Sequence, residues 1–262
     1  MSSLDRTISF FIVGGIGAGF LFATKFPFWF PHHAEISLVM LFCFLLFMTA
    51  GTSLWLAREK NSSLPSLHFA VTPLLLVGSA WGFFLLIEST RSRLTLVISL
   101  VSLLFFYFSF LRKENRIIEH FTDNDLLHFS FVLHALSAFF CFAFLFGMMS
   151  FTQISLPICA VIIAIFIAVV VEETLWRIEK NVKKHALIIL AFSVLAAEGF
   201  IALSFLPTLY LVDAVVAVIL FAYALHAVMH VLLGHAHQFS LRRQFTLSIS
   251  LVTLVFFTAQ WK

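Results

Sequence analysis

Residues 185–206 read HALIILAFSVLAAEGFIALSFL, an apolar run in which Glu198 is the only Asp, Glu, Lys or Arg. A helix needs about 20 residues to cross roughly 30 Å of membrane hydrocarbon, and this run has that length. Lipid offers the backbone no hydrogen-bond partners, so an apolar run this long is predicted to be a helix. Strands of a membrane β-barrel are shorter and alternate in polarity, which these residues do not. The run therefore predicts a membrane-spanning helix.

The composition of the whole chain agrees with that prediction. Of the 262 residues, 61% are apolar, 11% are charged and 35 are Phe, whereas soluble domains average about 45–50% apolar and about 25% charged residues. The three cysteines, Cys43, Cys141 and Cys159, lie within apolar runs and form no CxxC pair. These totals exclude a secreted disulfide scaffold, a nucleic-acid-binding protein and a disordered chain. A Phe-rich, multi-pass membrane protein is the class that remains.

Apolar runs bounded by charge, Pro or Gly predict nine spans in an all-α transmembrane bundle. We interpret the first run as a retained span, because it leads into Lys25 and a segment rich in Pro and aromatic residues rather than into a small-residue cleavage site. No low-complexity linker divides the chain, so residues 1–262 are expected to form a single integral membrane domain. The spans are expected at residues 6–24, 36–57, 65–87, 92–111, 126–149, 154–172, 185–206, 209–233 and 241–261.

The positions of Lys and Arg predict the orientation of these spans. With nine spans, twelve of the 16 basic side chains fall on the side that holds the N-terminus, and four fall on the other side. Cytoplasmic loops of membrane proteins carry the excess of Lys and Arg. We therefore expect the N-terminus in the cytoplasm, the C-terminus outside, and the chain in the plasma (inner) membrane.

Two pairs of glycines spaced four residues apart, Gly15 with Gly19 and Gly78 with Gly82, are predicted to let helices approach closely. Small residues matter at such contacts because lipid supplies no hydrophobic drive for helix association. Pro73 lies about one turn before Gly78 and is expected to bend its span, since proline donates no backbone hydrogen bond. We interpret these residues as packing features.

Histidines and carboxylates at membrane depth form the first candidate site. His226 and His230 are four residues apart, so they share one helix face, and two imidazoles so placed can bind one ion. At a rise of about 1.5 Å per residue, His134 and Glu172 lie at comparable depths on other spans. These four residues predict a site for a divalent metal, or for a haem that pairs His134 with a histidine of the eighth span. The alternative is that each histidine is neutral and hydrogen-bonded, which would hold neighbouring helices in register.

Glu198 forms the second candidate site, because it lies close to the expected midplane of its span. Ionisable groups at that depth are costly and usually functional, and no Lys or Arg occupies the centre of any span. Asp213 is expected about 6 Å further outward by the same rise per residue. The pair predicts a proton relay of the kind that a proton-coupled transporter needs. The alternative is a carboxyl group that seals one helix contact.

Three classes of function are compatible with these patterns. The chain shows no Gly-rich phosphate loop, no Ser-His-Asp order and no appended soluble domain, so we lean away from an enzyme. Short loops leave surfaces within the membrane as the only sizeable interface. We therefore favour a membrane-embedded subunit or scaffold, whose partners are the lipid bilayer and either another membrane protein or a second copy. The alternatives are a metal-binding protein or metal-dependent hydrolase, and a proton-coupled transporter of small solutes.

Overall fold

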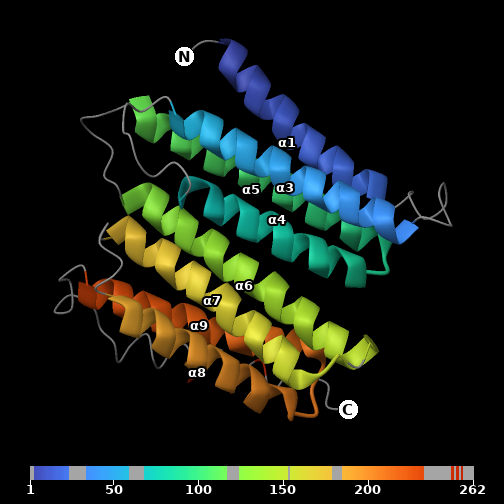
Figure 1. Ribbon diagram of the computed structural model, residues 1–262, viewed down its shortest axis with the longest axis vertical. Coiled ribbons are helices and arrows are strands. Elements are labelled where there is room, and N and C mark those ends of the chain that lie inside the picture. Colours follow the sequence, from blue (N-terminus) through green and yellow to red (C-terminus); the bar gives the residue numbers. More distant parts are fainter. Residues whose placement is uncertain are drawn as a thin grey trace. The chain divides into compact units, whose positions relative to one another are not determined.

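A computed structural model describes residues 3–23, 34–58, 68–116, 124–152, 154–178 and 185–232, together with residues 249, 250, 252, 253 and 255. Within these residues the chain forms helices and no strand, which confirms the prediction of an all-α fold. The eight helices, drawn in Figure 1, are α1 (Ser3–Ala23), α3 (Ala34–Arg58), α4 (His68–Leu86), α5 (Thr90–Arg116), α6 (Asn124–Thr152), α7 (Leu156–Ile178), α8 (Ala186–Ser204) and α9 (Tyr210–Leu232).

Seven of these helices, α3 to α9, are long and apolar enough to cross a membrane. In α1 the described apolar part, Ile12–Ala23, is shorter. Each of the first eight predicted spans thus coincides with a described helix. The ninth, at residues 241–261, lies outside the described residues apart from the few positions named above. The number of spans and the orientation of the termini therefore stay predictions.

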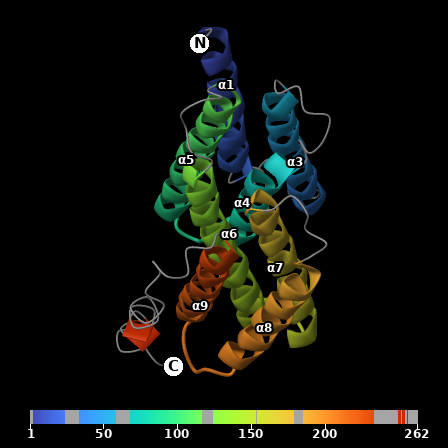
Figure 2. The same cartoon turned by 90° about the vertical axis from the view of Figure 1, so that its left-hand side faces the viewer.

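Contacts divide the chain into two compact units, residues 1–137 and 138–262, and the boundary falls inside α6. In the first unit, α1 packs against α3 and α5, and α4 also packs against α3 and α5. In the second unit, α7 packs against α8, and both helices contact α9. Figures 1 and 2 both show α7 and α8 side by side. The expected single membrane domain stays a prediction.

Aromatic rings from three helices form much of the core of the first unit. Phe20 of α1 meets Trp81 and Phe84 of α4 edge to face, with ring centroids 5.2 and 5.4 Å apart. Phe42 of α3 stacks on the Trp81 ring at 5.8 Å. Edge-to-face and offset pairs are the favoured arrangements of aromatic rings. These Phe residues therefore have a packing role that needs no other explanation.

Glycines of α1 let two neighbouring helices approach its backbone. A Cβ atom added to Gly19 would lie 2.7 Å from Leu45 of α3, and one added to Gly17 would lie 2.5 Å from Val101 of α5. At Gly15 an added Cβ would meet nothing within 4 Å. The close contacts thus involve Gly17, which faces α5, and Gly19, which faces α3.

Pro73 lies inside α4 and is buried. A proline has no N–H, so it leaves the carbonyl four residues earlier, here that of Phe69, without its usual helical donor. The hydroxyl of Tyr107 on α5 donates a 2.8 Å hydrogen bond to this carbonyl. Tyr107 is fully buried. A side chain from the next helix thus satisfies the backbone group that the proline freed, as neighbouring helices do in membrane proteins.

Candidate functional sites

His134 is buried in the first unit, on α6, and contacts α4. Its Nε2 atom lies 3.0 Å from Oγ1 of Thr72, at hydrogen-bonding distance, and only 1% of the residue is exposed. Ser130, one turn earlier on α6, is also buried, and its Oγ atom has no hydrogen-bond partner among the described residues. The Thr72–His134 contact links α4 and α6. This agrees with the alternative interpretation, in which hydrogen-bonded histidines hold neighbouring helices in register.

The carboxylates of α7 differ from each other in their surroundings. Glu172 is partly buried, whereas Glu173 is fully buried. Glu173 accepts hydrogen bonds from Arg177, with Oε1 at 2.8 Å from Nε and 2.7 Å from Nη2. Both guanidinium nitrogens donate to the same carboxylate oxygen, and hydrogen bonds between ionised groups are roughly twice as strong as those between neutral groups. Glu173 therefore has a structural partner one turn away on its own helix.

The predicted metal site is not assembled by the described residues. No group of three or more His, Cys, Asp or Glu side chains in the described part of the chain is placed to hold a metal ion. His226 is partly exposed on α9, and the side chain of His230 lies outside the described residues. His134 belongs to the first unit and Glu172 to the second. The four-residue site thus stays a prediction.

Glu198 lies on the outer face of α8, not in the interior of the second unit. The residue is exposed, as are Val194 and Ala202, one turn before and one turn after it, whereas Ile201 is partly buried. Leu187, about three turns earlier, is 80% exposed, and Phe205, two turns later, is 75% exposed. Within the described residues Glu198 forms no hydrogen bond or ion pair. A carboxyl group therefore interrupts an otherwise apolar and uncovered helix face.

Asp213 is buried near the start of α9 and accepts a hydrogen bond from the hydroxyl of Thr208. An acidic side chain in the first turn of a helix is also stabilised by the helix dipole. Its carboxylate faces a polar cavity of about 280 Å³ at the end of α8 and the start of α9. The lining residues of this polar cavity are Phe146, Met149, Ser150, Ser204, Leu206, Pro207, Thr208, Tyr210 and Asp213. Glu198 is not among them, and the proposed relay between the two acids stays a prediction.

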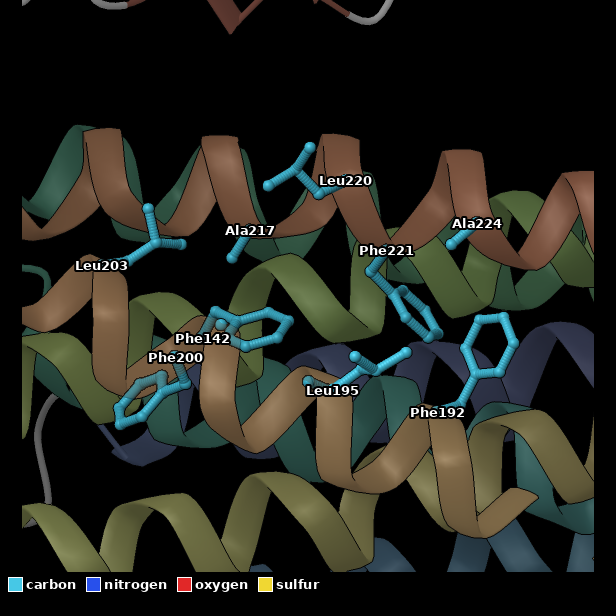
Figure 3. Close-up of a pocket in the computed structure, with 11 residues that line it drawn as sticks. Phe142, Phe192, Leu195, Phe200, Leu203, Ala217, Leu220, Phe221 and Ala224 are labelled. Carbon is cyan, nitrogen blue, oxygen red and sulfur yellow. The ribbon is translucent and has the colours of Figure 1, made fainter. Parts of the chain in front are cut away.

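A second cavity lies between α8 and α9, with Phe142 of α6 also in its wall, and its described lining residues are apolar. Its volume is about 200 Å³. Figure 3 shows Phe192 and Leu195 of α8 and Phe221 of α9 directed into the space between these helices. The lining residues of this apolar cavity are Phe142, Phe192, Leu195, Ala196, Gly199, Phe200, Leu203, Ala217, Leu220, Phe221 and Ala224. Sequence reasoning missed it, since apolar residues in a span carry no signal that separates a cavity from ordinary packing.

Comparisons of this chain with models of protein families, with curated proteins and with solved structures find no match.

Proposed function

We propose that this protein is a membrane-embedded subunit that self-associates through the outer face of α8. The observation that carries the proposal is the exposed carboxyl group of Glu198 in the middle of an apolar face. The α8 seam is defined by residues that recur at alternating intervals of four and three: Leu187, Ala191, Val194, Glu198, Ile201 and Phe205.

The spacing of the α8 seam is that of a helix–helix contact. Residues at alternating intervals of four and three align along one side of a helix and interlock with the equivalent residues of a second helix. A polar residue at one position of such a seam selects the register and the partner. Ala191 is small and lies two turns before Glu198, so it lets a second helix approach closely.

A second copy of the chain is the partner that this seam fits. In a two-fold dimer, a residue near the symmetry axis faces its own counterpart. At such a position the two Glu198 side chains would meet and form a hydrogen bond with each other. An acidic side chain at the centre of a span costs about 2.5–3.5 kcal/mol, and a hydrogen bond between membrane helices contributes about 0.6–1.7 kcal/mol. Association therefore offsets part of the free-energy cost of placing Glu198 within the membrane, and a monomer bears that cost in full.

Energy transfer between donor- and acceptor-labelled chains in liposomes, measured at increasing lipid dilution, tests the proposal. Glu198→Gln is expected to keep the association, because an amide also donates and accepts hydrogen bonds. Glu198→Leu is expected to raise the dissociation constant roughly 3- to 20-fold, which corresponds to the loss of that hydrogen bond.

Two variants that each introduce a Trp, one within the α8 seam and one outside it, test whether the seam is the interface. Ala191→Trp places a large side chain within the seam and is expected to weaken energy transfer. Ile165→Trp enlarges a residue on the outside of α7 that is already 61% exposed, and it is expected to have no effect. Equal energy transfer in both variants would show that α8 is not the interface. Stoichiometric co-purification of a different membrane protein, without self-association, would also contradict the proposal.

A further inference from the structure

The apolar cavity between α8 and α9 extends from the surface of this helix pair toward the interior of the second unit. The most buried of its described lining residues are Phe142 of α6 and Phe200 of α8, which are 2% and 1% exposed. Their rings stack with centroids 6.2 Å apart (Figure 3). Leu195 of α8 and Leu220 of α9 belong to the same lining and are 63% and 49% exposed. The cavity thus opens toward the lipid that surrounds these helices in a membrane.

Small residues in the wall of this cavity leave it open. Ala196 and Gly199 of α8 and Ala217 of α9 belong to the lining. Small residues between membrane helices usually let the backbones come into close contact, as at Gly19, where an added Cβ would lie 2.7 Å from Leu45. A Cβ added at Gly199 would meet nothing within 4 Å. The small side chains of α8 and α9 therefore leave room for a molecule that belongs to neither helix.

We propose that this cavity binds the end of a hydrocarbon chain, which a phospholipid of the bilayer supplies. The described lining residues are apolar, and atoms that line an empty space lack dispersion contacts that an apolar occupant restores. The volume of about 200 Å³ exceeds the roughly 150 Å³ of an apolar protein cavity that binds benzene. A protein helix, about 10–12 Å across, is too wide to enter. No residue of the α8 seam is among the described lining residues, so the proposal does not depend on self-association.

The depth of the cavity selects the end of a lipid chain over a head group. Ala196 lies near the middle of the apolar span Ala186–Ser204, and Leu220 lies near the middle of the apolar span Tyr210–Met229. The middle of a span is about 15 Å from either boundary of a hydrocarbon layer roughly 30 Å thick. Head groups stay at those boundaries, because a polar group loses its hydrogen bonds on entering hydrocarbon. The terminal carbons of a lipid chain are the part that reaches this depth.

Photo-crosslinking of the unaltered chain in lipid nanodiscs, with phosphatidylcholine that carries a diazirine at the end of one acyl chain, tests the proposal. Leu195 and Ile165 of α7 form a matched pair, because both lie near the middle of a span and are 63% and 61% exposed. The cavity lining around Leu195 is expected to be labelled about fivefold more than the surface around Ile165. Equal labelling would overturn the proposal, since lipid would then only surround the helices. Labelling of the lining by diazirine-labelled hexadecane but not by the phospholipid would overturn the phospholipid as the source of the chain.

Two glycine variants test whether the labelled chain enters the cavity. Gly199→Leu places a side chain in the cavity, where an added Cβ has open surroundings. Gly51 of α3 is exposed with the same open surroundings, and Gly51→Leu is the matched control. Gly199→Leu is expected to lower labelling of the lining about fivefold and to keep its helical circular dichroism, whereas Gly51→Leu is expected to leave the labelling unchanged. Unchanged labelling in Gly199→Leu, or an equal fall in both variants, would overturn the proposal. If Gly199→Leu loses its helical signal, the comparison of Leu195 with Ile165 in the unaltered chain decides.

Discussion

Pro73 cannot donate a helical hydrogen bond to the Phe69 carbonyl of α4. Removing the Tyr107 hydroxyl tests whether α5 supplies the missing donor. Tyr107→Phe keeps the ring that fills the core and deletes only the donor to the Phe69 carbonyl. A buried acceptor left without a partner costs about 1–3 kcal/mol in soluble proteins. Hydrogen bonds between membrane helices average about 0.6 kcal/mol and reach about 1.7 kcal/mol. We therefore expect the free energy of unfolding to fall by about 1 kcal/mol.

The cause of that loss is identified by a second substitution. Pro73→Ala restores a backbone N–H four residues after Phe69, so the carbonyl regains a helical donor. In the Pro73→Ala background, Tyr107→Phe is expected to cost much less, which gives a coupling energy of about 0.6–1.7 kcal/mol between the two positions.

Unfolding in mixed micelles of a mild detergent and sodium dodecyl sulfate, followed by circular dichroism, measures the four variants of this cycle. Ser109→Ala on the same helix is the control, because within the described part of the chain that exposed hydroxyl bonds only to the Phe105 carbonyl of its own helix. Its cost is expected to stay below about 0.5 kcal/mol. If Tyr107→Phe costs as much in the Pro73→Ala background as it does when Pro73 is present, the reasoning is refuted, since the hydroxyl would then act without reference to the proline.

Two further predictions concern the acidic and histidine side chains. Glu173 and Arg177 form an almost fully buried ion pair, so Glu173→Gln is expected to cost about 3–5 kcal/mol by removing the negative charge with which Arg177 pairs. The double variant Glu173→Leu with Arg177→Leu is expected to recover most of that free energy in the same unfolding assay, and a double variant as unstable as the single one would contradict this. If His134, Glu172, His226 and His230 hold a metal or haem, elemental analysis or the absorption spectrum of the purified chain is expected to show it in stoichiometric amount. His226→Ala is then expected to remove the metal or haem without unfolding the protein. Purified protein that contains neither would contradict this hypothesis.

The helices of this protein could be predicted from the sequence because their cause is local. The run at residues 185–206 became α8 at Ala186–Ser204, and the run at residues 36–57 became α3 at Ala34–Arg58. Each segment must satisfy its own backbone hydrogen bonds in lipid, whatever its neighbours do. The predicted span at residues 92–111 matches the apolar segment of α5, Thr90–Leu111, although the helix itself continues to Arg116 through charged residues. Hydropathy marks the end of the apolar stretch, whereas the helical hydrogen bonds continue beyond it.

The candidate sites could be predicted only in part. Residue spacing along a span gives the depth of a side chain in the membrane, whereas the packing of the helices decides which way that side chain faces. Counting residues placed Glu198 near the middle of its span, but only packing showed that it lies on the outer face of α8. His134 was identified as a polar residue at membrane depth, yet its partner Thr72 is 62 residues away in the chain. No spacing rule within one helix reveals such a partner.

The sequence by itself determined that this chain forms apolar helices of membrane-spanning length, because hydropathy and backbone hydrogen bonding act within each segment. Tertiary structure decided which polar groups face a neighbour, a cavity or the outside. Tyr107 meets the carbonyl freed by Pro73, Asp213 lines a cavity, and Glu198 is left on an open face. Those outcomes depend on how helices rotate and pack against one another, and in lipid that packing is determined by the shapes and polar contacts of side chains from distant segments.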